Sequence, residues 1–142
     1  PKPSSAASDV YKRQPYMLTE VDVIIKANTG PEVITGSTRM KAGTATKMIV
    51  NMISTTTMIK LGKVYKNLMI DLMAVNNKLI DRAVRIIMQI TGISYEKAKK
   101  KLFGAKKSVK AAIIMIKLDC DLEKANKKIK KFNGVLSNII DE

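Results

Sequence analysis

Between Gly30 and Lys47 the sequence reads GPEVITGSTRMKAGTATK, so glycines and short hydroxyl residues directly precede a helical pattern. The first turn of a helix has backbone N–H groups without an intrahelical partner, and it carries the positive end of the helix dipole. A loop of small residues at this place suits a phosphate or another anion. The same pattern also fits a well-capped helix start that binds nothing, and spacing alone favours that interpretation.

Two cations, Arg39 and Lys41, add charge to this run. Successive helical residues are about 100° apart, so these two side chains are expected on different faces of the helix. Lys41 falls on the side of Met48 and Met52, whereas Arg39 points away. A cation on an apolar face usually has a partner, which makes Lys41 the better candidate for reaching into a site or a subunit interface.

From about Thr38 to near Gly62 the apolar residues recur with a helical period, which predicts one long, core-facing helix. The residues of its apolar face are Ala45, Met48, Ile49, Met52, Ile53, Thr56 and Ile59. Further upstream, the pattern from Val21 to Ile25 predicts a β-strand, and Gly30-Pro31 marks the turn after it. A single strand cannot satisfy its own backbone groups, so we expect its sheet partners in residues upstream of this chain.

A second helix is predicted from Asn77 to Thr91, with Asn76 or Asn77 as its N-cap and Gly92 as its end. Its apolar stripe consists of Leu79, Ala83, Ile86, Ile87 and Ile90. The structure between Val64 and Met73 is not predicted by the pattern.

The last third of the chain contains a weak internal repeat, since the sequence YEKA at residues 95–98 recurs as LEKA at residues 122–125. Ser94 and Asp121 precede the two copies as N-caps, and a short apolar segment comes after each copy, at residues 109–116 and 135–140. The pattern predicts a small bundle of short helices. Its core residues are expected to be Ala98, Leu102, Ala112, Ile113, Ile116, Ile129, Leu136 and Ile139.

Composition limits the class of protein. The 142 residues, 46% of them hydrophobic, suffice for one ordinary domain, or for a small domain joined to part of another. The single cysteine, Cys120, excludes an intramolecular disulfide and favours a cytoplasmic location. Lys, Asn or Asp interrupts every apolar run before it reaches the roughly 18 residues of a membrane span, so no membrane association is expected.

The net charge of +14 raises the question of nucleic-acid binding. Lysine accounts for 22 of the 26 basic residues, whereas specific base recognition depends on arginine forks and stacking aromatic residues. Between Ser94 and Lys131 there are 13 lysines and four acids, which fits the solvated faces of amphipathic helices. We therefore expect salt-sensitive, nonspecific adhesion to polyanions and no specific nucleic-acid partner.

Residues 1–14 have no apolar periodicity and join abruptly to the rest of the chain. The stretch from Ser5 to Gln14, above all DVYKRQ at residues 9–14, resembles the translated read-through of a transposon-end sequencing adapter. We exclude these residues from the fold prediction; a native N-terminal arm is the alternative. If the adapter interpretation holds, the chain is a fragment of a longer protein.

The run from Gly30 to Lys47, with Met48 to Ser54 and Gly62 to Met69, resembles the signature region shared by N-acetylmuramic acid 6-phosphate etherases and glucokinase regulatory proteins. The resemblance extends through Ala74 to Gly92 and, more loosely, to the C-terminus. Nearly everything after Gln14 is therefore similar to the second half of that family.

Two departures from the family pattern lie outside the signature run. Thr56-Thr57 stands where a Gly is common, and Lys66 replaces a more usual Gly or Gln.

The resemblance implies a fold. Residues 15–75 would be the C-terminal part of a sugar-isomerase (SIS) domain, an α/β domain whose parallel sheet would end with the strand Val21 to Ile25. Residues 76–92 would form a connecting helix, and residues 93–142 a small all-α domain similar to ubiquitin-associated folds.

The resemblance also implies a reaction. Family members are lyases that cleave the D-lactyl ether of N-acetylmuramic acid 6-phosphate, giving N-acetylglucosamine 6-phosphate and D-lactate in cell-wall sugar recycling. They use no metal or organic cofactor, and two glutamates act as acid and base. Both glutamates are expected upstream of this chain, so no catalytic residue is assigned here and the chain is expected to be inactive alone.

What the chain would contribute is part of the sugar-phosphate pocket or of the interface of a cytoplasmic homodimer. The candidate residues are Glu32, Ser37, Thr38, Arg39 and Lys41. Glu32 has the chemistry of an acid catalyst, but it is at neither of the family's catalytic positions.

Two other functions stay open. Regulatory proteins with the same signature hold a sugar phosphate without turning it over and control a partner enzyme; they are much longer and have two sugar-isomerase domains, so the short tail after the signature favours the etherase. The lysine-rich tail could instead be a polyanion-binding or protein-interaction module, which would require steep salt dependence together with a sequence or partner preference.

The predicted elements have one physical consequence. A strand and a long helix without their sheet leave apolar surface exposed, so we predict association or partial disorder before Asn76, and a better folded helical tail.

Overall fold

The computed structural model describes residues 22–141, and the predicted adapter-derived segment, residues 1–14, lies outside them. The chain divides into two compact units, with the division between Thr56 and Thr57, inside the first helix. Each unit is described by itself below.

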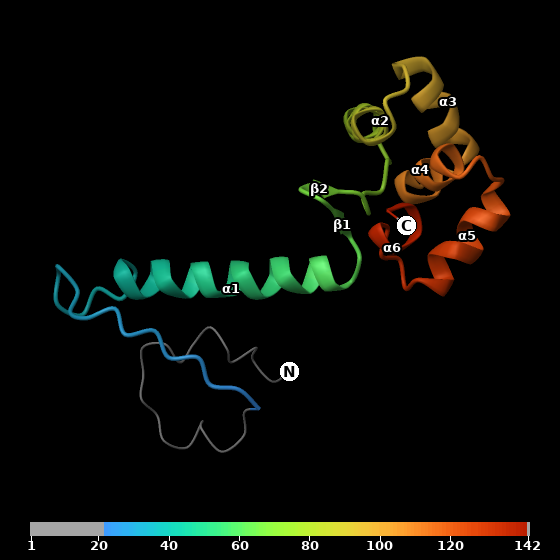
Figure 1. The fold of residues 1–142 in the computed structure, drawn as a ribbon. Coiled ribbons are helices and arrows are strands. Elements are labelled where there is room, and N and C mark those ends of the chain that lie inside the picture. The colour runs from blue at the N-terminus through green and yellow to red at the C-terminus, as the bar shows by residue number, and fades with distance from the viewer. Residues whose placement is uncertain (1–21, 142) are drawn as a thin grey trace. The chain divides into compact units, whose positions relative to one another are not determined.

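The first unit consists of an extended segment, a loop and most of helix α1 (Lys41–Lys60), as Figure 1 shows. The predicted strand is not formed at residues 22–25, and Val21 lies outside the described residues. Val23, Ile24 and Ile25 are exposed, and none of the described residues pairs with them as a neighbouring strand. The strand prediction is therefore wrong for this chain, because an extended segment needs a neighbour to bond its backbone.

Helix α1 begins at Lys41, later than the predicted start near Thr38, and is followed by Gly62 in a left-handed conformation with φ +66°. Its predicted apolar face is not part of a core in this chain: Met48 and Met52 are 58% and 57% exposed. Ala42 is the one buried residue of the helix. The apolar surface expected from the absence of a sheet is thus exposed on α1, and association or partial disorder before Asn76 stays a prediction.

Exposed apolar residues also occur on the opposite side of α1, at Val50 and Met58. These two residues lie about 140° from the middle of the predicted stripe, one on each side, whereas the polar residues Lys47 and Ser54 lie between them. One core-facing stripe therefore describes α1 incompletely.

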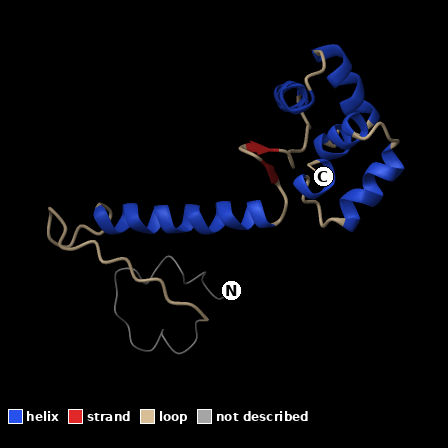
Figure 2. Ribbon diagram, viewed as in Figure 1, coloured by secondary structure: helices blue, strands red, loops and turns tan. Residues whose placement is uncertain are grey.

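The second unit begins with a β-hairpin that the pattern did not predict (red in Figure 2). Strands β1 (Val64–Tyr65) and β2 (Leu68–Met69) are antiparallel, and Tyr65 is opposite Leu68. Lys66 in the turn has φ 54°, in the left-handed region that two-residue hairpins require. The sequence pattern does not predict this hairpin because its strands are only two residues long and its turn has no glycine.

Helix α2 (Asn77–Thr91) confirms the prediction at both ends. The Asn76 side chain accepts a hydrogen bond from the Leu79 N–H at 2.9 Å, which satisfies one donor of the first turn. At the other end Gly92 has φ 74°, and its N–H donates to the Met88 carbonyl.

Four further helices complete the second unit, as predicted from the repeat: α3 (Tyr95–Gly104), α4 (Val109–Lys117), α5 (Leu122–Lys131) and the single turn α6 (Ser137–Ile140). Asp121 caps α5 by accepting from the Lys124 N–H at 2.8 Å. Ser94 is in the N-cap position of α3, but its side chain makes no capping hydrogen bond.

The core of the second unit lies around α4, which packs against α2, α3 and α5. Of the predicted core residues, Ile116 and Ile129 are half-buried at its edge and the other six are buried. The same core includes Ala83, Val84 and Ile87 of α2, and it reaches Tyr65 and Ile70 of the hairpin segment. The hairpin, α2 and the short helices therefore share one core.

Two close contacts fix the segment around the hairpin, one to the C-terminal segment and one to α4. A Cβ atom at Gly62 would lie 2.6 Å from the carbonyl oxygen of Gly134, so the two backbones touch where no side chain fits. The nearly buried Lys110 pairs with Asp71 at 3.3 Å, and Lys63 approaches the same carboxylate at 3.5 Å.

Candidate functional site

The signature loop, residues 31–42, turns back on itself immediately before α1 (Figure 1). The Ser37 N–H donates to the Ile34 carbonyl at 2.9 Å, and the Gly43 N–H donates to the Thr38 carbonyl at 2.9 Å. Gly36 has φ +81°, a conformation that glycine adopts without strain. The short residues that looked like an anion cradle therefore form a turn held by its own backbone.

Glu32 closes the base of this loop. Its two carboxylate oxygens accept hydrogen bonds from the backbone N–H groups of Lys41 and Ala42, each at 3.0 Å. In the opposite direction, the Lys41 Nζ donates to the Pro31 carbonyl at 2.9 Å. The anion at the start of α1 is thus a carboxylate of the chain itself.

These contacts change the acidity of Glu32. The hydrogen bond from Ala42, followed by that from Lys41, holds the pKa of the Glu32 carboxyl below its ordinary value, because both stabilise the ionised form. The helix dipole acts in the same direction, since a negative charge is favoured at a helix N-terminus. Glu32 is therefore an ionised cap at neutral pH.

Comparison with known proteins gives concordant results. A family model described as the C-terminal lid domain of glucokinase regulatory protein matches residues 66–109. The chain is 46% identical over 139 residues to the N-acetylmuramic acid 6-phosphate etherase of Shouchella clausii, covering 98% of this chain and 47% of that protein. It is 53% identical over 115 residues to the etherase of Oceanobacillus iheyensis (81% and 39%) and 55% identical over 120 residues to that of Lactobacillus johnsonii (84% and 40%).

The chain is homologous to the N-acetylmuramic acid 6-phosphate etherases. It spans less than half the length of these curated relatives. The match to the lid-domain model begins in the hairpin turn and ends at the first residue of α4.

The structure brings together two of the five site residues predicted from the etherase resemblance, Glu32 and Lys41. Ser37 and Thr38 are half-buried in the loop, and Arg39 is exposed. Because α1 starts at Lys41, Arg39 belongs to the preceding turn, and the prediction that it lies on another face of the helix was wrong. Lys41 has the expected partner, but that partner is the Pro31 carbonyl.

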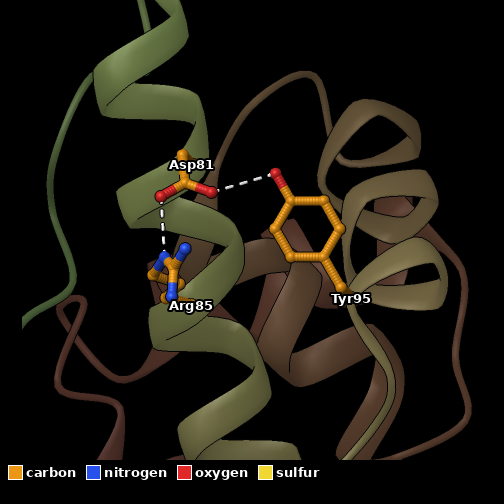
Figure 3. A network of polar contacts seen from close by, with 3 residues as sticks. All are labelled: Asp81, Arg85 and Tyr95. Atoms are coloured by element: carbon orange, nitrogen blue, oxygen red, sulfur yellow. Dashed lines mark hydrogen bonds and ion pairs between the residues drawn. The ribbon is translucent and has the colours of Figure 1, made fainter.

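The chain has a second polar cluster, between α2 and α3 (Figure 3). The Asp81 carboxylate accepts from Arg85 at 2.7 Å and from the Tyr95 hydroxyl at 3.0 Å. The bond from Arg85, then that from Tyr95, lowers the pKa of Asp81, and the same carboxylate raises the pKa of Tyr95. The bond between Tyr95 and Asp81 joins the start of α3 to α2.

A shallow pocket of about 290 Å³ lies between the hairpin and the C-terminal segment, lined by Ile59, Val64, Tyr65, Lys66, Val135, Ser137 and Asp141. The Tyr65 hydroxyl donates to Asp141 at 2.7 Å, and this bond raises the pKa of Tyr65 to about 12. That bond joins the hairpin to the end of the chain and is a structural contact.

Residues 22–141 contain no group of three or more His, Cys, Asp or Glu side chains that could hold a metal ion. In the same part of the chain, no helix is both long enough and apolar enough to cross a lipid bilayer. Of the 13 lysines between Ser94 and Lys131, all except Lys110 are exposed, so that lysine-rich segment presents solvated faces, as predicted.

Proposed function

We propose that this chain is the C-terminal part of a lyase that cleaves the D-lactyl ether of N-acetylmuramic acid 6-phosphate to N-acetylglucosamine 6-phosphate and D-lactate. Its identity of 46–55% to etherases over most of the chain carries the proposal. The signature loop, closed by Glu32 and Lys41, is the part that contributes to the sugar-phosphate pocket or to the interface of a homodimer. No metal or organic cofactor takes part.

The acid and base of this reaction lie outside the chain. Glu32 is an ionised cap with both oxygens engaged, Glu96 is exposed at the start of α3, and Glu123 pairs with Lys127 at 2.7 Å. Elimination of lactate needs two carboxyl groups of different acidity at one substrate, and the glutamates among residues 22–141 offer no such pair. We therefore expect the chain to be inactive alone.

In the intact protein, residues 15–75 belong to a sugar-isomerase domain with a parallel sheet, and residues 93–142 to a helical domain similar to ubiquitin-associated folds. The exposed apolar residues of α1 support the first assignment, since such a helix needs cover. The four short helices α3 to α6 support the second. A cytoplasmic location follows from the reaction proposed.

We further propose that residues 1–14 are derived from a sequencing adapter. The abrupt change in composition after residue 14 supports this origin. The alignment that covers 98% of the chain runs into these residues and argues against it. Resequencing the source DNA across residues 14 and 15 with a library made without transposons tests it. A frame that continues into a sugar-isomerase domain with two suitable glutamates is the expected result; a stop codon before a native Pro1 would contradict it.

The activity is tested with a chimera in which this chain, from residue 22 onward, replaces the part of the Oceanobacillus iheyensis etherase to which it aligns. We expect the chimera to release D-lactate from N-acetylmuramic acid 6-phosphate and the chain alone to release none. The unaltered relative is the positive control. A folded chimera that releases no D-lactate while the relative is active would overturn the proposal.

A non-catalytic regulatory module is the second candidate, because residues 66–109 match the lid domain of glucokinase regulatory protein. Such a module would bind a sugar phosphate without turning it over. Calorimetric titration of the chimera with N-acetylglucosamine 6-phosphate, beside the D-lactate assay, separates binding without turnover from catalysis.

A further inference from the structure

We propose that Glu32 and Lys41 are positioning residues, and that Arg39 is the cation by which this loop meets the phosphate of the substrate. The inference rests on the proposed function, since it assigns separate roles within the same candidate site. It reverses the order expected from the helical pattern, in which Lys41 was the better candidate for reaching a site.

The first step is the reciprocal geometry at the base of the loop. The Glu32 side chain reaches forward to the N–H groups of Lys41 and Ala42, and the Lys41 side chain reaches back to the Pro31 carbonyl. Each end of the loop thus holds the backbone of the other end with a charged group. Charge-assisted hydrogen bonds are shorter and stronger than neutral ones, so this clamp restricts residues 33–40 between two fixed points.

The second step is that the hydrogen bonds of the clamp already engage the Glu32 carboxylate and the Lys41 amine. Both Glu32 oxygens accept a backbone N–H, and the Lys41 amine is bonded to a carbonyl. The N-terminus of α1 already has its negative charge in Glu32. A further anion there would have to displace that carboxylate, so the end of the helix is a poor place for the phosphate of a substrate.

The third step concerns what the clamped loop presents. Arg39 is exposed, and none of the described residues forms an ion pair with it. The neighbouring Ser37 and Thr38 are half-buried, and their backbone groups hold the turn. A guanidinium matches the geometry of a phosphate with two parallel hydrogen bonds, which an ammonium group does not. Lys41 keeps its charge and two further N–H donors, but its amine is tied to the Pro31 carbonyl. Arg39 is therefore the cation of this loop that no described contact ties to the loop itself.

The clamp is tested first on the chain alone, by amide hydrogen exchange measured with NMR. We expect the N–H groups of Lys41 and Ala42 to be protected in the wild type and to exchange faster in Glu32→Ala. In the Lys60→Gln variant, which changes an exposed cation at the other end of α1, protection should stay the same. Equal exchange of these two amides in the wild type and in Glu32→Ala would overturn the clamp.

The roles are then separated by steady-state kinetics of the chimera. Arg39→Gln should raise KM for N-acetylmuramic acid 6-phosphate roughly 10- to 100-fold, with a smaller effect on kcat, because a charged hydrogen bond to the phosphate is lost in ground state and transition state alike. Arg39→Lys should recover part of this loss. Lys41→Gln should raise KM less than Arg39→Gln, and Lys60→Gln should leave it within about 2-fold.

A double-mutant cycle tests whether Glu32 acts through Arg39. If it does, Glu32→Gln raises KM by itself but adds nothing in the Arg39→Gln background, with unfolding temperatures equal among the variants. A merely structural cap would give additive effects on stability and no such coupling in KM. Additive KM effects, or an Arg39→Gln variant that behaves like Lys60→Gln, would overturn the assignment.

Failure of this inference and failure of the proposed function are distinguishable. An inactive but folded wild-type chimera would overturn the proposed lyase function and, with it, the substrate role of Arg39. The amide exchange of the chain alone would still show whether the clamp exists. An active chimera in which Lys41→Gln raises KM more than Arg39→Gln keeps the lyase function and overturns the division of roles.

Discussion

The two units of the chain contain similar apolar residues and bury them very differently. In residues 22–56, Ala42 is the one buried hydrophobic residue, whereas the core of the second unit extends from Tyr65 to Ile139. The difference lies in partners. In the second unit each short helix meets others close in sequence, while the described part of the first unit contains no second helix or strand of its own to cover its apolar residues. Local pattern produces a helix in both units, but only the second unit has the elements to form a core.

The largest expected effect contrasts the two units directly. Ile113→Ala removes a side chain with 0% exposure from the middle of α4 and should lower the free energy of unfolding by about 2–5 kcal/mol. Met52→Ala in α1, 57% exposed, should change it by no more than about 0.5 kcal/mol. Urea unfolding followed by circular dichroism gives both values, and similar losses in the two variants would show that α1 is part of a core.

A second comparison lies within the second unit, between two glycines with left-handed backbones. Gly92→Ala has nothing within 4 Å of the new Cβ and should cost about 1 kcal/mol through backbone strain alone. Gly62→Ala meets backbone atoms of Gly134 at 2.6–2.7 Å and should cost about 1–3 kcal/mol more. Thermal unfolding of both variants tests this; equal losses would mean that the contact between residues 62 and 134 does not persist in solution.

A smaller effect is expected at the hydrogen bond that joins the hairpin to the C-terminal segment. Tyr65→Phe loses the bond to Asp141 and should cost about 1–3 kcal/mol below pH 10. The folded-state pKa of Tyr65 is raised from 10.0 to about 12, so this contribution is present below pH 10 and is lost as the pH rises through about 12. The difference in stability between wild type and variant should therefore shrink over that range, and a constant difference would contradict the bond.

The smallest effect belongs to the first unit and concerns the Glu32 cap. Its folded-state pKa lies below the ordinary 4.5, so the stabilisation is present above pH 4.5 and is lost as the pH falls through the folded-state value. Protection of the Lys41 and Ala42 amides should decline in that acid range, after correction for intrinsic exchange, and Glu32→Gln should lack this dependence. Amides in the middle of α4 are the internal control. A wild-type loop with no acid transition would show that the carboxylate does not cap the helix in solution.

Much of the second unit could be predicted from sequence because its signals are local. Asn76, Asp121 and Gly92 act within one turn of their helices, so the bounds of α2 and the start of α5 follow from residue types. Ser94 shows the limit of such reasoning, since a residue in the N-cap position did not make the capping bond.

The rest could not be predicted because it depends on contacts between distant residues. Residues 22–25 alternate like a strand, but a strand exists only where another segment accepts its hydrogen bonds. The bonds from Glu32 to residues nine and ten positions later are invisible to any periodic pattern. One signal could have indicated them: α1 has no acid in its first turn, so an acid from elsewhere was needed to complement the dipole.

Cys120 lies half-buried just after α4, with its sulfur 3.9 Å from the Ile114 carbonyl oxygen, and it is the only thiol of the chain. The protein consequently has a built-in reporter of transient opening. The rate at which a thiol reagent modifies Cys120 measures how often this edge of the core opens, without any engineered label. Building the chain into the chimera with the Oceanobacillus iheyensis etherase should leave that rate unchanged if the second unit is stable by itself, and slow it if the unit depends on the remainder of the chimera.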